Sequence, residues 1–176
     1  SAMAFGFDPD LSTWSPFHGA VYAIVEAVAK IVAVGGKADT VRLTLQEYFE
    51  RLGTDPKKWG KPFAALLGAL RAQHEMGIPA IGGKDSMSGT FEHLSVPPTL
   101  VAFAVATMRA NEALSPEFKY PGNTVVMVPV AHDAQDLPVF SRLNSNFEKI
   151  HQLIADNKAF SAMSVGRGGI AAAISK

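Results

Sequence analysis

The stretch IGGKDSMSGTF, residues 81–91, holds the residue types most suited to chemistry in this chain. Adjacent glycines let backbone N–H groups approach an oxyanion, a lysine adds a positive charge, and an aspartate can hold Mg²⁺. These types predict a phosphate-binding loop built from Gly82, Gly83, Lys84, Asp85, Ser86 and Ser88. A polar turn with solvated Lys84 and Asp85 explains the same residues, because short turns of this composition are common.

The spacing excludes the familiar nucleotide loops. A P-loop requires a glycine at position 78 and a hydroxyl at position 85, whereas this chain has Ile78 and Asp85. No G-x-G-x-x-G fingerprint is present, and no serine lies in a recognisable hydrolase motif with a histidine base. The stretch is therefore not a Walker motif, and neither a dinucleotide site nor a hydrolase triad has support.

Composition narrows the class of protein. The 48% apolar and 18% charged residues are typical of a globular domain, and the net charge of +0 argues against a generic nucleic-acid binder. The absence of cysteine excludes disulfides and thiolate metal sites. The longest apolar run, residues 21–34, is interrupted by Glu26 and Lys30, so no run appears long enough for a membrane span. We expect a cytoplasmic protein that binds neither nucleic acid nor membrane.

Hydrophobic periodicity predicts alternating helices and strands, which is typical of the α/β or α+β class. We expect helices over residues 17–34, from Pro62 to Met76, around 143–154 and from 168 onward. We expect strands over residues 41–45, 78–81, 99–107, 124–130 and 159–165, and a loop over residues 4–16. The turn at residues 120–123 is the best candidate for a domain boundary.

Several stretches together resemble phosphoribosylformylglycinamidine synthase, the large amidotransferase of purine biosynthesis. The stretch GIPAIGGKDSMSGTF is similar to a signature of that family, and WGKPFAALLGALRAQHEMG precedes it at the family's spacing. The stretch FHGAVYAIVEAVAKIVAVGGK resembles the family's magnesium-binding helix, PPTLVAFAVAT its following strand, and SVGRGGIAAAIS the start of its next helix. The resemblance covers roughly residues 5 to 176.

The resemblance implies part of the second of two tandem repeats, each similar to aminoimidazole ribonucleotide synthetase. Residues 4–110 would be a partial N-terminal subdomain, 111–123 a linker, and 124–176 the start of a C-terminal α/β subdomain. Residues 1–3 resemble a tag remnant, and the last helix stops without a cap, so we expect a piece of a longer polypeptide. An N-terminal subdomain of this kind pairs its sheet with that of a partner to form a barrel.

The resemblance also implies an activity for the whole enzyme. Such an enzyme uses ATP and Mg²⁺ to activate the amide oxygen of formylglycinamide ribonucleotide, which ammonia from a separate glutaminase domain then displaces. Its partners would be the sister repeat and the glutaminase domain, and its substrate a small molecule. We expect the isolated chain to be inactive and to self-associate as a homo-oligomer through the surface it would otherwise bury.

The resemblance assigns roles to residues unevenly. Lys84 and Asp85 would be catalytic residues, and Glu26 and Asp85 would hold the metal, with Glu26 on a helix facing the signature. The family has an asparagine four residues after that glutamate, whereas this chain has Lys30, which cannot ligate Mg²⁺. We therefore hypothesise that Lys30 and Arg167 replace the metal's charge and leave a structural pseudo-site. A Glu26–Lys30 helix ion pair is the plain alternative.

Two other readings stay open. In the first, this repeat is a scaffold that supports its sister repeat and has no ligand of its own. In the second, the chain comes from another ATP-dependent member of the superfamily, such as a small-molecule kinase. Elsewhere, Glu47 and Glu50 flank the aromatic residues Tyr48 and Phe49, and we expect both carboxylates to be solvated at the end of an element.

Overall fold

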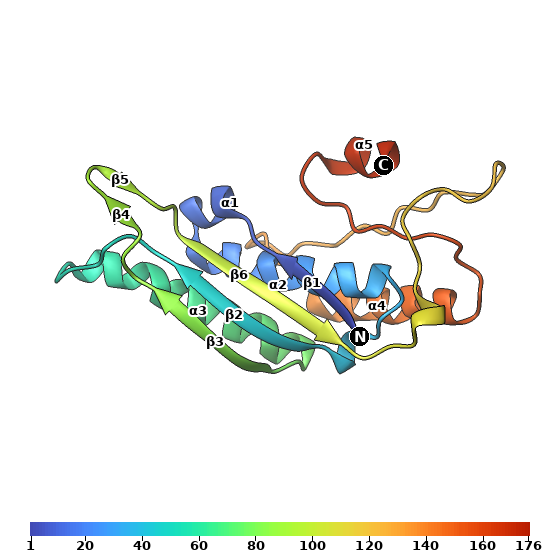
Figure 1. The fold of residues 1–176 in the computed structure, drawn as a ribbon, viewed down its shortest axis with the longest axis horizontal. Coiled ribbons are helices and arrows are strands. Elements are labelled where there is room, and N and C mark those ends of the chain that lie inside the picture. The colour runs from blue at the N-terminus through green and yellow to red at the C-terminus, as the bar shows by residue number, and fades with distance from the viewer.

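A four-stranded sheet carries the signature residues in the computed structural model, which describes residues 1–176 (Figure 1). The strand order is β1 (Ala2–Gly6), β6 (Thr99–Ala106), β2 (Arg42–Tyr48) and β3 (Ala80–Ser86). β6 pairs antiparallel with both β1 and β2, and β2 pairs parallel with β3. The mixed sheet with its helices confirms the predicted class.

Helices α2 (Pro16–Ala33) and α3 (Pro56–Met76) cover one face of this sheet (Figure 1). Alternate residues of the strands, such as Leu43, Leu100 and Ala102, point toward the helices and are buried. We expected no run long enough to span a membrane, but α2 is long and apolar enough to do so by length and composition. However, 61% of this helix is buried inside the fold. Its apolar character is that of a core helix, because the sheet and neighbouring helices contact it on several sides.

Both covering helices begin at a proline that follows a capping side chain. Ser15 accepts a hydrogen bond from the His18 N–H at the start of α2, and Asp55 accepts one from the Lys57 N–H at the start of α3. The predicted start of α3 at Pro62 was therefore wrong, because the Asp55 cap starts the helix earlier and Pro62 lies within it. At the crossing of α2 and α3, Gly68 is required for close approach, because a Cβ there would lie 2.1 Å from the Phe17 carbonyl oxygen.

The remaining elements are short, apart from one helix. They are α1 (Pro9–Trp14), two 3₁₀ turns at Ala38–Thr40 and Ala110–Glu112, the hairpin β4 (Thr90–Phe91) and β5 (Leu94–Ser95), α4 (Phe140–Ala155) and α5 (Gly169–Ser175). The helix α4 packs against α2 and α3, and its Leu143 and Phe147 belong to the same core as the sheet. The division at residues 120–123 stays a prediction, but α4 shares this core although it lies beyond that point.

Three of the predicted local structures were wrong. Residues 4–16 were expected to be a loop but contribute to β1 and form α1. The inward positions of β1 are Ala and Gly, so the strand shows no clear alternation of apolar and polar residues in the sequence. Residues 124–130 and 159–165 were expected to be strands but form none. Residues 124–130 are rich in β-forming types, whereas Phe160 and Val165 are the only such residues in 159–165. A strand also needs a neighbour for its N–H and C=O groups, and no other segment pairs with either run. Residues 2 and 3, set aside as a tag remnant, lie in β1.

The other face of the sheet is not covered by any helix and is apolar over β1 and β6. Met3 and Phe5 on β1 are 79% and 50% exposed, and Phe103 and Val105 opposite them on β6 are 42% and 40% exposed. A solvated sheet face ordinarily carries polar residues. We refer to these four side chains as the open apolar face.

Candidate functional site

The signature residues form an edge strand rather than a loop. Gly82, Gly83, Lys84, Asp85 and Ser86 all lie in β3, which pairs with β2 on one side and has no strand on the other. An anion-binding nest requires a backbone that alternates between right- and left-handed conformations, whereas β3 is extended and neither glycine has a positive φ. The predicted cradle of glycine N–H groups is therefore not formed, and neither is the alternative turn.

One of the two glycines has a packing role. A Cβ on Gly83 would lie 2.4 Å from the carbonyl oxygen of Leu45 on β2, whereas a Cβ on Gly82 would meet nothing within 4 Å. Gly83 thus lets the two parallel strands approach each other, just after the irregularity in their register between Leu43 and Thr44.

Strand alternation separates the predicted site residues into two groups. Lys84 pairs in register with Gln46, and Ser86 with Tyr48, so these four residues share the uncovered face of the sheet. Lys84 is exposed and forms no ion pair. Ser88 follows the strand and is exposed. The uncovered face therefore offers a free ammonium group beside hydroxyl and amide groups, a combination able to bind an anion.

Asp85 lies on the opposite face of β3, directly opposite Glu47 of β2. Glu47 is only 1% exposed, and neither of its carboxylate oxygens has a hydrogen-bond partner. Burial, followed by the negative charge of Asp85, raises the pKa of Glu47 to about 8. Glu47 is therefore mainly neutral at pH 7, and Asp85 has a buried carboxylic acid as its neighbour.

The expectation of a solvated Glu47 was wrong, and the sequence contained a signal against it. Val41, Leu43 and Glu47 are in phase along the run, and the first two are buried against the helices. If the alternation of the strand continues for two residues beyond Leu45, Glu47 lies on the buried face. The same prediction was made for Glu50, which the structure pairs with two lysines instead. The ion pairs of Glu50 with Lys61 and Lys58 lower the pKa of its carboxyl group.

Glu26 does not face Asp85. The Phe7 N–H donates a hydrogen bond to Glu26 Oε2 at 3.1 Å, next to β1, whereas Asp85 lies on β3 at the other edge of the sheet. Three strand spacings separate these edges, or about 14 Å. A metal held jointly by Glu26 and Asp85 is therefore incompatible with this arrangement.

Glu26 instead forms the helix ion pair that was the plain alternative. Lys30 Nζ lies 2.7 Å from Glu26 Oε1 and donates a hydrogen bond of 2.7 Å to the Phe5 carbonyl oxygen. The same ammonium group lies 4.8 Å from the centre of the Phe5 ring. Lys30 thus joins α2 to β1.

Arg167 is also paired, with Asp10 of α1. The loop that carries it comes close to α2, since a Cβ on Gly166 would lie 3.8 Å from Glu26 Oε1. The structure therefore brings Glu26, Lys30 and the 166–169 loop to one region, in which both cations already have carboxylate partners.

The residues do not fit a self-contained magnesium site. Nowhere do three or more acidic or histidine side chains gather as ligands for a metal ion. Mg²⁺ requires oxygen ligands, and the predicted ligand Glu26 has one carboxylate oxygen on Lys30 and the other on a backbone N–H.

Solved structures from Thermotoga maritima share this fold. PurL complexed with AMPPCP matches 96% of the chain with a TM-score of 0.71 at 16% sequence identity. PurL complexed with FGAR matches 94% with a TM-score of 0.67 at 18% identity, and phosphoribosylformylglycinamidine synthase II matches 94% with a TM-score of 0.66 at 18% identity. The fold is that of phosphoribosylformylglycinamidine synthase.

The shared fold confirms the fold that the resemblance implied. The chain spans about a quarter of the length of these synthase structures, 27%, 25% and 26% respectively. No protein-family model matches the chain, and no curated protein matches it by sequence.

Proposed function

We propose that this chain is part of the second repeat of a phosphoribosylformylglycinamidine synthase. The complete enzyme would convert formylglycinamide ribonucleotide, glutamine and ATP to formylglycinamidine ribonucleotide. The observation that supports this most is the shared fold over 94–96% of the chain with PurL structures that hold AMPPCP and FGAR. The isolated chain would be inactive, and the complete protein cytoplasmic.

Within that enzyme, β3 would contribute an anion-binding edge to the uncovered face of the sheet. Lys84 would neutralise phosphate or another negative charge, and the hydroxyl groups of Ser86 and Ser88 would donate hydrogen bonds to the same anion. This assignment is supported by the exposure of Lys84 and by its lack of any ion-pair partner in the chain. Asp85, on the other side of the strand, would orient the edge rather than contact that anion.

The open apolar face would be the surface that meets the sister repeat. Met3, Phe5, Phe103 and Val105 form a contiguous set across two paired strands, and exposed apolar patches of this kind ordinarily mark interaction surfaces. In the isolated chain, a second copy would occupy the same surface and give a homo-oligomer. The glutaminase domain would be a further partner of the complete enzyme.

A second candidate function is a scaffold without a nucleotide of its own. It is favoured by the ion pairs in the region of α2 and the 166–169 loop, where Lys30 occupies Glu26 and Arg167 is held by Asp10. A nucleotide phosphate would have to displace these carboxylates. Titration of the chain with Mg-ADP distinguishes a nucleotide-binding repeat from a scaffold. Micromolar binding that is lost in Lys30→Ala or Arg167→Ala would refute the scaffold hypothesis.

The proposed role of β3 is tested in the complete enzyme with Lys84→Ala and Asp85→Ala. For a functional edge, we expect Lys84→Ala to lower kcat/KM by at least about tenfold, the loss expected for a charge-assisted hydrogen bond, with an unchanged melting temperature. Unchanged kcat/KM in both variants would refute the edge. A loss of melting temperature with unchanged specific activity of the folded fraction would instead support the scaffold.

A further inference from the structure

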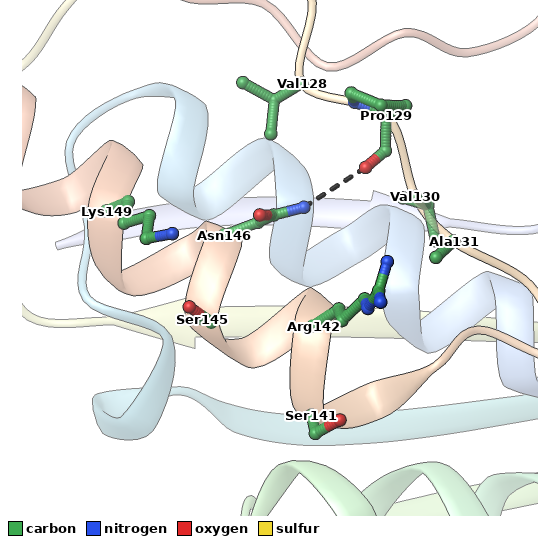
Figure 2. Close-up of a pocket in the computed structure, with 9 residues that line it drawn as sticks. All are labelled: Val128, Pro129, Val130, Ala131, Ser141, Arg142, Ser145, Asn146 and Lys149. Atoms are coloured by element: carbon green, nitrogen blue, oxygen red, sulfur yellow. Dashed lines mark hydrogen bonds between the residues drawn. The ribbon is translucent and has the colours of Figure 1, made fainter.

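A hollow of about 510 Å³ lies between α4 and the segment that crosses over it (Figure 2). One wall is the chain at Val128, Pro129, Val130 and Ala131, and the other is a row of α4 side chains. The walls are tied together, since Asn146 Nδ2 donates to the Pro129 carbonyl oxygen at 3.2 Å and the Val139 N–H donates to the Ala131 carbonyl oxygen at 2.8 Å. Binding cavities for small molecules typically have volumes of about 300–1,000 Å³.

The helical wall is polar and positively charged. It consists of Ser141, Arg142, Ser145, Asn146 and Lys149, which follow one side of α4, while Leu143 and Phe147 turn inward to the core. No acidic residue is among the nine that line the hollow, so its formal charge is that of one arginine and one lysine. Neither cation forms an ion pair in the chain, unlike Lys158, three residues beyond the end of α4, which pairs with Asp156.

The two cations lie at either end of the polar row. Figure 2 shows Arg142 extending toward the 130–131 segment and the Lys149 amine pointing toward Asn146, which lies between them. Seven positions along a helix correspond to about 10 Å, a span that two long side chains can narrow from both ends. The arrangement suits a ligand with more than one anionic oxygen group, because the arginine donors form a planar fork and the lysine supplies a second charge.

The opposite wall has a different character. Val128 is 44% exposed and stands with Pro129 over the polar row, so a bound anion would contact apolar surface on one side (Figure 2). An apolar wall facing a few convergent polar groups is the usual composition of a small-molecule site. None of the signature residues of β3 lies in this hollow, and neither do Glu26 or Arg167.

We propose that this hollow binds a small phosphate-bearing molecule whose phosphate oxygens meet Arg142 and Lys149 and whose apolar portion contacts Val128 and Pro129. The site is separate from the edge strand of the proposed function, and neither depends on the other.

The test is a titration of the isotope-labelled chain with pyrophosphate and with ADP, without Mg²⁺, followed by NMR. We expect saturable shifts at the amides of residues 141–149, and a weakening of about tenfold in each of Arg142→Gln and Lys149→Gln, as loss of one charge-assisted contact implies. Lys158→Gln removes a positive charge just beyond the end of α4, outside the hollow, and is expected to bind like the wild type.

Further arms of the titration define the ligand class. If the apolar wall contributes, ADP binds more tightly than pyrophosphate, and Val128→Ser removes that advantage while leaving pyrophosphate affinity unchanged. Equal binding of citrate and pyrophosphate would overturn the phosphate assignment. The absence of saturable shifts at residues 128–149, or affinities unchanged in both Arg142→Gln and Lys149→Gln, would overturn the site; circular dichroism establishes that each variant is folded.

Discussion

Glu47 on β2 lies directly opposite Asp85 on the parallel strand β3, and Glu47 is buried without a hydrogen-bond partner. Removing a carboxylate from water without a cation beside it favours the protonated form. The pair therefore links the signature strand to the core through an acid that is neutral at pH 7 and charged at higher pH.

The first prediction concerns the dependence of stability on pH. The pKa of Glu47 is raised to about 8 in the folded chain from an ordinary value of 4.5, so the folded state holds this proton more tightly than the unfolded state. Its contribution is complete below the unfolded pKa and is lost as the pH rises toward the folded pKa. We expect the free energy of unfolding of the wild type to fall between pH 5 and pH 8 relative to Glu47→Gln, measured by urea denaturation.

Every other titratable group is present in both proteins, so the difference between the two curves isolates Glu47. Parallel curves for the wild type and Glu47→Gln would contradict a raised pKa at this position.

A second prediction compares the two glycines of the signature. Gly83→Ala places a methyl group 2.4 Å from the Leu45 carbonyl oxygen, whereas Gly82→Ala meets open space. We expect Gly83→Ala to destabilise the chain by roughly 1–3 kcal/mol, the usual effect of overpacking, and Gly82→Ala to change stability by much less. Thermal unfolding of the two variants measures the contrast, and equal melting temperatures would show that β2 and β3 are not packed this closely.

A third prediction concerns Lys30, which donates to the Phe5 carbonyl oxygen and pairs with Glu26. Lys30→Ala is expected to cost about 1 kcal/mol of stability, typical of one partly exposed hydrogen bond, because it loosens β1 from α2. Lys30→Asn introduces the residue that the resemblance implies at this position, and we expect this variant to bind Mg-ADP more tightly than the wild type, as measured by calorimetry. Weaker or equal binding in Lys30→Asn would count against a pseudo-site created by this substitution.

A fourth prediction addresses association. Phe103→Lys puts a charge in the centre of the open apolar face, while Phe63→Lys makes the same change at an exposed phenylalanine of α3, on the covered side of the sheet. In sedimentation equilibrium we expect the wild type and Phe63→Lys to self-associate and Phe103→Lys to be monomeric, because a charge buried in an apolar contact is unfavourable. If only Phe63→Lys dissociated the oligomer, the interface would lie on α3 instead of the open apolar face.

Local signals in the sequence predicted most of the helices and the inner strands. α2, α4 and β6 occupy nearly the predicted ranges because the two helices have clear apolar periodicity and β6 is an unbroken apolar run; Gly35–Gly36 after α2 and Pro97–Pro98 before β6 also mark element ends. The strands predicted at 124–130 and 159–165 failed for the opposite reason. The types in 124–130 favour an extended chain, but pairing depends on a neighbouring strand that local sequence does not reveal, and 159–165 has few β-forming residues.

The candidate site also has features that the sequence predicted and features that only the tertiary structure decided. The sequence by itself identified residues 82–88 as the chemically distinctive stretch, and its resemblance to a known family predicted the fold, because residue types and their spacing are local properties. Only the tertiary structure decided that the stretch is an edge strand, that Glu47 lies beside Asp85, that Glu26 lies at the other edge and that Arg142 and Lys149 line a hollow. These relationships arise from strand order and helix packing, which bring together residues that are far apart in the chain.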